Sequence, residues 1–275
     1  MRLFIAVAGV MLIALLTLGA PTADAAKKID IFVYTEITQW IGQAQAQEQA
    51  DIFMDEIKGK QGIGEVVNDP AKVIEQWTKD HTQDKANHLI VLYGDFPPEI
   101  YPAGNAKKDG SVAEEFLDAG NSFANSADYF FWGLQGRNEE GGIKNMMDID
   151  NMVQWDDDTP MKVTAEGKEY TPTLDDVNID RPFHLDKLDN DWELEIAFAT
   201  DTGKADANRC DPCIVRNTKT DARLIQVYQT ANQADPKGMV LAEIILNYYL
   251  EVVGALDVDP EDKLPTLWAD IKTRR

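Results

Sequence analysis

Short apolar runs alternate with amphipathic stretches in the first third of the chain. Residues 29–34 (IDIFVY) and 88–93 (HLIVLY) are rich in β-branched and aromatic side chains, and residues 65–67 (EVV) form a shorter run between them. Continuous apolar runs of this kind are typical of strands buried on both faces of a parallel sheet. Residues 43–58 and 73–77 instead place apolar side chains at helical spacing. The order strand–helix–strand–helix–strand predicts right-handed crossovers and a doubly wound α/β sheet.

A third helix and a closing helix extend this pattern. Ser111 and Glu114 match a capping box, in which the two side chains satisfy exposed backbone donors at the start of a helix. That helix should end at Gly120, and a short strand should begin near Ser122. Residues 235–253 begin with Asp-Pro and carry apolar side chains at helical spacing, so they predict the last helix.

The region between these helices has a different character. Residues 133–191 are interrupted by glycines and crowded with aspartates, which predicts a β-rich insertion with a hairpin near residues 166–167. Strict alternation of apolar and other side chains over residues 192–199 predicts a half-buried strand. Residues 213–229 predict a hairpin that turns at residues 219–221.

The N-terminus predicts export. Residues 3–18 are uniformly apolar and follow Arg2, but the run is shorter than the roughly 20 residues that span a membrane. Ala23-Asp24-Ala25 is a small-x-small cleavage site, so we expect residues 1–25 to be a secretory signal peptide and the mature protein to be periplasmic or extracellular. An uncleaved N-terminal anchor is the alternative. Residues 26–254 then form one domain, and residues 255–275 form a tail that docks through Leu267, Trp268 and Ile271.

Composition limits the classes of partner. The chain has 275 residues, and 44% of them are hydrophobic, which is enough for a sizeable core. It carries 48 Asp+Glu against 26 Lys+Arg, a formal net charge of −22. Nucleic acids and anionic membranes select clustered basic residues, so neither is an expected partner. With only three histidines and two cysteines, the sequence predicts no metal site and no cofactor.

The order of these elements resembles the class I glutamine amidotransferase-like fold and, within it, the trehalose-utilisation (ThuA-like) group. The resemblance rests on the strand at 29–34 followed by a helix, the strand at 89–93 followed by a glycine-containing loop, and the sequence FLDAGN at 116–121 before residues 122–128. The strand at 223–229 and the helix at Gly238 also resemble the end of those proteins. The resemblance implies a three-layer, mostly parallel, flavodoxin-like sheet.

Three further blocks resemble a family of exported bacterial proteins. They are LYGDFP at 92–97, DRPFHL at 180–185 and IVRNT at 214–218. This likeness covers most of the mature chain, but it implies no activity.

The sequence departs from the amidotransferase pattern where the chemistry would occur. Those enzymes need a cysteine nucleophile on the elbow after a central strand and a His-x-Glu pair near the C-terminal end. Residues 125–128 (NSAD) occupy the elbow without a cysteine, and no histidine follows Asp186. Because the mechanism requires a thiolate activated by an imidazole, glutaminase activity is not expected.

The elbow residues allow two interpretations. Ser126 and Asp128 should lie at the carboxyl ends of the strands, where open α/β sheets bind ligands. A hydrolase would use Ser126 or Asp128 with His184, the one histidine in the insertion that could fold back over the elbow. No G-x-S-x-G sequence surrounds Ser126, and the alternative is that both side chains only bond to the loop backbone.

The loop at residues 94–102 suggests a small polar ligand. Asp95, Glu99 and Tyr101 follow a predicted strand in a proline-stiffened loop. An aromatic ring beside carboxylates suits a sugar or polyol, which makes a carbohydrate the leading ligand class. Asn105 and Asn121 are candidates for the same rim. The alternative is a structural turn that only closes the strand.

Two other groups of residues have candidate chemistry. The acidic stretches at 148–151, 156–158 and 186–191 could make this an acidic surface module that binds calcium, but none has the spacing of a calcium loop, and a solvated acidic face is the alternative. Cys210 and Cys213 form a lone C-x-x-C. In an oxidising compartment we expect a local disulfide, with two free thiols as the alternative.

Overall fold

A computed structural model describes residues 27–38, 40–68, 71–84, 86–107, 109–126, 129–132, 138 and 140–256. The predicted signal peptide, the docking residues of the tail and Asp128 lie outside these described residues. Within them, no helix is long and apolar enough to cross a membrane.

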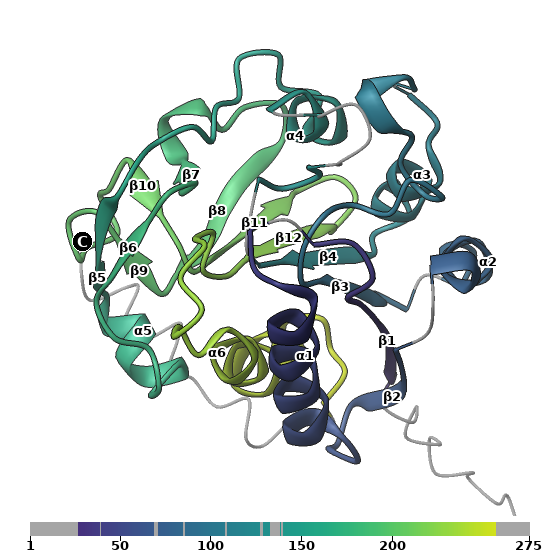
Figure 1. The fold of residues 1–275 in the computed structure, drawn as a ribbon, viewed down its shortest axis with the longest axis horizontal. Coiled ribbons are helices and arrows are strands. Elements are labelled where there is room, and N and C mark those ends of the chain that lie inside the picture. The colour runs from purple at the N-terminus through teal and green to yellow at the C-terminus, as the bar shows by residue number, and fades with distance from the viewer. Residues whose placement is uncertain are drawn as a thin grey trace, which may run out of the picture.

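The centre of the molecule is a seven-stranded, mostly parallel sheet (Figure 1). Its strands follow the order β2-β1-β3-β4-β12-β11-β8. The first five pair in parallel, and β11 and β8 add an antiparallel edge. The parallel part has the flavodoxin order 2-1-3-4-5, so the predicted α/β fold is confirmed. In the sheet order the strands are β2 (Ile63–Val67), β1 (Ile29–Tyr34), β3 (Leu89–Leu92), β4 (Ser122–Asn125), β12 (Arg223–Gln226), β11 (Cys213–Asn217) and β8 (Trp192–Ala197).

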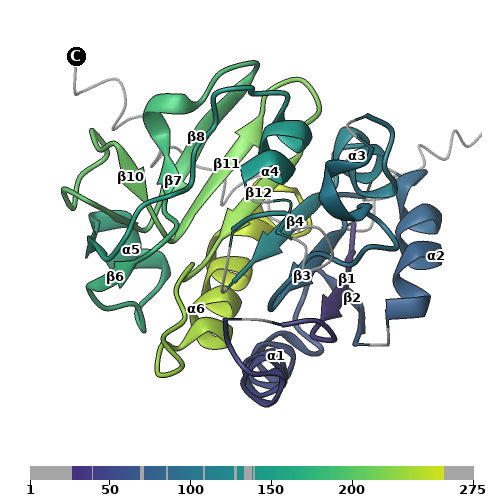
Figure 2. The same ribbon diagram turned by 45° about the horizontal axis from the view of Figure 1, so that its top comes forward.

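Helices cover both faces of this sheet (Figures 1 and 2). On one face α1 (Gln43–Ile57) packs beside α6 (Lys237–Ile244) over a core that includes Phe53 and Ile244. The two helices approach closely, because a Cβ on Gly238 would lie 2.1 Å from the Gln49 carbonyl oxygen. A π-helical segment (Ile245–Tyr249) and α7 (Leu250–Val252) continue α6, in agreement with the long predicted helix.

The opposite face is covered by α2 (Ala71–Thr82) and α3 (Val112–Asp118). Trp77 and Phe116 from these helices pack against each other in a second core. The capping box is formed as predicted: Ser111 Oγ accepts from the Glu114 N–H at 3.1 Å, and Glu114 accepts from the Ser111 N–H. The helix α4 (Glu140–Met147) lies on the same side of the sheet as α2 and α3, above β4 (Figure 2).

A second, antiparallel sheet forms the predicted β-rich region. Its order is β6-β5-β9-β10-β7. The strand predicted over residues 192–199 is divided, because the chain leaves β8 at Phe198 and enters β9 of the second sheet. The strands are β6 (Val177–Ile179), β5 (Thr159–Val163), β9 (Ala199–Thr200), β10 (Arg209–Cys210) and β7 (Phe183–His184).

The predicted hairpin near residues 166–167 is wrong. Residues 165–170 form the short helix α5 (Ala165–Tyr170), and the Thr164 side chain caps it by accepting from the Gly167 N–H at 2.9 Å. The turn-like composition around Gly167 therefore starts a helix instead. Gly167 is needed there because a Cβ would lie 2.0 Å from the Phe198 carbonyl oxygen.

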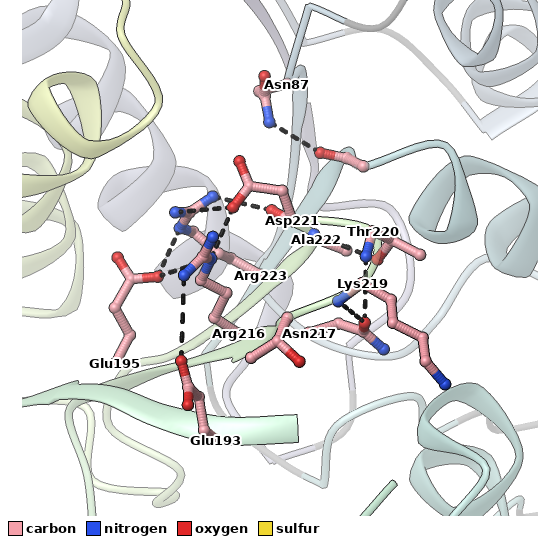
Figure 3. Close-up of polar contacts among 12 residues, drawn as sticks. Asn87, Glu193, Glu195, Arg216, Asn217, Lys219, Thr220, Asp221, Ala222 and Arg223 are labelled. Carbon is pink, nitrogen blue, oxygen red and sulfur yellow. Dashed lines mark hydrogen bonds and ion pairs between the residues drawn. The ribbon is translucent and has the colours of Figure 1, made fainter. Parts of the chain in front are cut away.

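A network of charged side chains holds the amino edge of the sheet at β12 (Figure 3). Arg223 Nε lies 2.8 Å from Glu195 Oε2, and Arg223 Nη2 lies 3.3 Å from Asp221 Oδ1. Arg216 also pairs with Asp221, at 2.6 Å. The Arg223 and Glu195 side chains are 3% and 12% exposed, so this pair is buried, whereas Arg216 and Asp221 lie nearer the surface at 35% and 43%.

Candidate functional site

The carboxyl ends of the parallel strands meet at one edge of the sheet, where open α/β sheets bind their ligands. Asn125 ends β4 and Ser126 follows it, whereas Tyr93 follows β3. On the other side of β4, Gln226 ends β12 and Gln229 lies three residues beyond it. All five residues are buried. The strand order therefore brings polar side chains from distant parts of the chain to one place.

Buried amides connect the ends of β4 and β12. Gln229 Nε2 donates to the Asn125 carbonyl at 2.8 Å and to Asn125 Oδ1 at 3.1 Å. Gln226 Nε2 donates to the Arg181 carbonyl at 2.9 Å, and Gln226 Oε1 accepts from Gln154 Nε2 at 2.8 Å. The Gln226 amide is thus bonded through both its oxygen and its nitrogen, whereas Gln229 is bonded through its nitrogen.

Asp211 is the acid of this network. Its carboxylate accepts from the backbone N–H groups of Tyr228 (2.7 Å) and Gln229 (2.9 Å) and from Gln226 Nε2 (3.1 Å). Complete burial raises the pKa of Asp211 to about 7, although these hydrogen bonds and Lys237 oppose the shift. Burial also lowers the pKa of Lys237 to about 8, and its Nζ donates to the carbonyls of Tyr228 (3.2 Å) and Thr230 (3.1 Å).

Several buried polar atoms at this edge have no hydrogen-bond partner. Asn125 Nδ2, Ser126 Oγ and Gln229 Oε1 are buried and unpaired, as are the hydroxyls of Tyr34 and Tyr93. Buried polar groups in folded proteins are nearly always paired with protein or with ordered water. The three unpaired atoms of Asn125, Ser126 and Gln229 lie together at the carboxyl ends of β4 and β12.

Aromatic rings adjoin these polar groups. Tyr129 stacks on Trp132, with centroids 5.1 Å apart, and on Trp155, with centroids 6.5 Å apart. The guanidinium of Arg181 lies over Trp40, Tyr129 and Trp155. Trp155 is 60% exposed, which is unusual for so large a ring. We call Arg181 and these four rings the aromatic group.

The predicted catalytic residues are not joined in this structure. The Ser126 hydroxyl has no hydrogen-bond partner, so among the described residues no imidazole is bonded to it. His184 lies in β7, and its Nε2 faces Asp156 Oδ2 at 3.9 Å. Burial, followed by the charge of Arg209, lowers the pKa of His184. Among the described residues, no general base of the kind that a nucleophile requires is bonded to the serine.

The residues predicted for the ligand rim lie in different places. Asp95 is buried beside the end of β3, and its N–H donates to the Ile37 carbonyl at 2.9 Å, whereas Glu99 is exposed. Tyr101 is a core residue that contacts Phe96 and Phe131, and its hydroxyl accepts from Asn145, so it offers no open ring face. Asn105 ends a short 3-10 helix (Ala103–Asn105), and its side chain lies outside the described part of the structure.

Asn121 lies at the opposite edge of the sheet from this rim. It precedes the first residue of β4, and its Oδ1 accepts from the His88 N–H at 2.8 Å. Its Nδ2 donates to the carbonyls of Phe116 (3.2 Å) and His81 (3.3 Å). The side chain thus joins two strands and two helices at the amino edge.

Cys210 and Cys213 are free thiols here rather than a disulfide, and both are completely buried. Burial raises the pKa of the Cys213 thiol well above its usual value, and its Sγ donates to the Cys210 carbonyl at 3.7 Å. A buried, protonated thiol is a poor nucleophile. Neither cysteine is placed as the nucleophile of a glutamine amidotransferase.

Asp30, His81 and His88 come close enough together to be considered as metal ligands. His81 Nε2 lies 3.3 Å from Asp30 Oδ2, and His81 Nδ1 donates to the Trp77 carbonyl. His88 is already engaged at both nitrogens, because Nδ1 accepts from the Asp30 N–H at 2.9 Å and Nε2 lies 2.8 Å from Asp84. Only two donor atoms remain, fewer than a structural zinc site uses.

The acidic stretches are partly neutralised by basic side chains. Asp156 and Asp186 both pair with Arg209, at 3.1 and 2.9 Å. Arg209 lowers the pKa of Asp156, and Lys187 followed by Arg209 lowers the pKa of Asp186. A pocket of about 590 Å³ beside β5 and β6 is also lined by Asp158, Asp176 and Asp235. Asp235 is ion-paired with Lys237 at 3.6 Å, so this pocket has no arrangement of free carboxylates that would identify a calcium site.

Sequence reasoning found the edge of the sheet but missed Arg181 and the aromatic group. Their rings come from positions 40, 129, 132 and 155, which no local pattern connects. One signal was present, because no Lys or Arg other than Arg181 lies between Lys168 and Lys187, in a segment rich in aspartate.

No protein-family model matches the sequence, and no curated protein is significantly similar to it. In structure, the chain is similar to a ThuA-like protein from Bacteroides uniformis, whose crystal structure is known. The two share 12% sequence identity and a TM-score of 0.46, and the match covers 88% of this chain and 97% of the other.

Proposed function

We propose that this protein binds a small polar ligand, with carbohydrates as the leading class, at the carboxyl edge of its parallel sheet. The unpaired buried atoms of Asn125, Ser126 and Gln229 carry this proposal. A sugar has hydroxyls that both donate and accept, so it could satisfy all three at once. The exposed face of Trp155 adds a surface on which a sugar ring can stack.

The proposal is one of binding rather than glutaminase chemistry. Both thiols are completely buried, and the Ser126 hydroxyl has no bonded base. The apolar N-terminal run and the Ala-x-Ala site support export of the mature chain. The protein would then meet its ligand in the periplasm or outside the cell.

A thermal-shift screen of sugars and polyols on the mature chain tests the proposal. A ligand that binds the folded protein raises the melting temperature by mass action. Ser126→Ala should weaken binding of that ligand about threefold to tenfold, which corresponds to one net hydrogen bond. Ser122→Ala is the matched control, because Ser122 is equally buried in the same segment but at the amino end of β4.

Two results would refute the proposal. One is a mature protein whose melting temperature no sugar or polyol changes at millimolar concentration. The other is a ligand whose affinity falls equally in Ser126→Ala and Ser122→Ala, since binding at the carboxyl edge requires only the first to matter.

A further inference from the structure

Arg181 is a buried cation at the candidate site. It lies between β6 and β7, and only 6% of the residue is exposed. Its N–H donates to the Gln229 carbonyl at 3.2 Å, and its own carbonyl accepts from Gln226 Nε2 at 2.9 Å. The residue is therefore held against the carboxyl end of β12, next to the unpaired amides.

Dipoles and rings surround its guanidinium group. Nη1 donates to the carbonyls of Asp156 and Asp180, at 2.6 Å each. The buried Nε–H has no partner. Three rings lie within cation–π distance of Cζ, with centroids at 4.0 Å for Trp155, 4.7 Å for Tyr129 and 4.8 Å for Trp40.

No described carboxylate pairs with Arg181, and this sets it apart from the other described arginines. Arg223, which is similarly buried, has Glu195 at 2.8 Å and Asp221 at 3.3 Å. Arg209 and Arg216 likewise pair with carboxylates, at 2.9 and 2.6 Å. In a chain with a net charge of −22, three of these cations have anions beside them and Arg181 has none among the described residues.

The acids nearest to it in sequence and space have other partners. The Asp156 carboxylate bonds to Arg209, and Asp180 Oδ1 accepts from the Asp158 N–H. Glu140 Oε1 accepts from the N–H groups of Gln154 and Trp155, next to the ring that covers Arg181. These carboxylates therefore bond to Arg209 or to backbone N–H groups, and none of them pairs with the Arg181 guanidinium. The guanidinium can then bind an anion from outside the chain.

Removing a cation from water is costly unless an anion compensates for it. The free Nε–H can donate a charge-assisted hydrogen bond to a carboxylate. Two more buried donors are unpaired, namely Trp132 Nε1, within the aromatic group, and Asn125 Nδ2, beside Gln229. The site therefore offers one described cation, two neutral donors and flat aromatic rings. This combination suits a ligand that has one negative charge and a ring that can stack on an aromatic side chain.

We propose that Arg181 binds the carboxylate of an acidic sugar, of the hexuronate class, whose ring stacks on the exposed face of Trp155. This assignment rests on the proposed ligand site and specifies its substrate class. The neighbouring unpaired amides and the Ser126 hydroxyl then bind the sugar hydroxyls.

The test compares matched acidic and neutral sugars on the mature chain by calorimetry. Glucuronate is paired with glucose, and galacturonate with galactose, so that each pair differs only in the carboxylate. We expect one hexuronate to bind about tenfold or more tightly than its neutral partner, the gain of a charged hydrogen bond. Arg181→Gln should remove that preference, and Arg181→Lys, which keeps the charge but loses the planar fork, should reduce it.

Arg216→Lys is the control. Because Arg216 lies at the amino edge of the sheet, this variant should leave the preference for the acidic sugar unchanged. Should Arg181→Gln fail to fold, Arg181→Lys and Trp155→Ala, at an exposed position, still carry the test. Equal binding of acidic and neutral sugars would overturn this inference and leave the proposed function standing. If no sugar binds, both fall. An acid preference that persists in both Arg181 variants also overturns the inference.

Discussion

Replacing Arg223 by methionine should destabilise the protein strongly. The Arg223 side chain is 3% exposed and its partner Glu195 is 12% exposed, so their contact at 2.8 Å is a buried ion pair. Removing one member of such a pair costs about 3–5 kcal/mol, because the other charge remains buried without compensation. In this variant Glu195 would still have the Tyr248 hydroxyl at 3.2 Å and Arg216 at 4.0 Å. Because these contacts partly compensate its charge, we expect the free energy of unfolding to fall by about 3 kcal/mol.

Urea unfolding followed by tryptophan fluorescence measures this loss as a change in midpoint at constant slope. Lys219→Met is the matched control, because Lys219 pairs with Asp191 at 2.5 Å but is 74% exposed, and exposed pairs contribute about 0–1 kcal/mol. The double variant Arg223→Met/Glu195→Leu should recover most of the lost stability, since it leaves no unpaired charge. The reasoning is refuted if Arg223→Met costs no more than Lys219→Met, or if the double variant is less stable than Arg223→Met.

Three further predictions concern the acid of the network, a helix contact and the thiols. Burial raises the pKa of Asp211 from 3.8 to about 7, so its contribution to stability is full below pH 3.8 and is lost as the pH rises through about 7. The difference in unfolding free energy between wild type and Asp211→Asn should therefore shrink between acidic and mildly basic pH, and a constant difference would contradict this. Gly238→Ala should lower stability by about 1–3 kcal/mol in urea melts, because its Cβ would overlap the Gln49 carbonyl, whereas Gly42→Ala, with open space, should not. Cys210 and Cys213 should resist a thiol reagent such as DTNB until the protein unfolds, and rapid labelling of native protein would show that they are accessible.

Local sequence patterns predicted the fold correctly wherever the signal for a helix or strand lies within that element itself. The runs at 29–34 and 88–93 became central strands of the sheet, because only strands buried on both faces tolerate so few polar residues. The capping box at Ser111 works within four residues and formed as predicted. The prediction failed at Gly167, where close approach of the Phe198 backbone, not a turn, requires the glycine.

The candidate site was only partly predictable. Ser126 could be placed at the carboxyl edge, because a residue that follows a parallel strand must lie there. The role of Tyr101 could not be foreseen, because its ring is turned into the core by Phe96 and Phe131. Nor could Arg181 be singled out, since what distinguishes it, that no described carboxylate pairs with it, depends on distances in the folded chain.

By itself, the sequence determined the strand and helix pattern, the likeness to an amidotransferase-like fold and the loss of a cysteine at the elbow. These properties depend on residues that are close together in the sequence, so their spacing can be read from the sequence. Only the tertiary structure decided that positions 125, 155, 181 and 229 lie in contact with one another. Sheet order and the placement of the insertion bring them together, and whether a buried charge or amide finds a partner depends on distances that no local pattern contains.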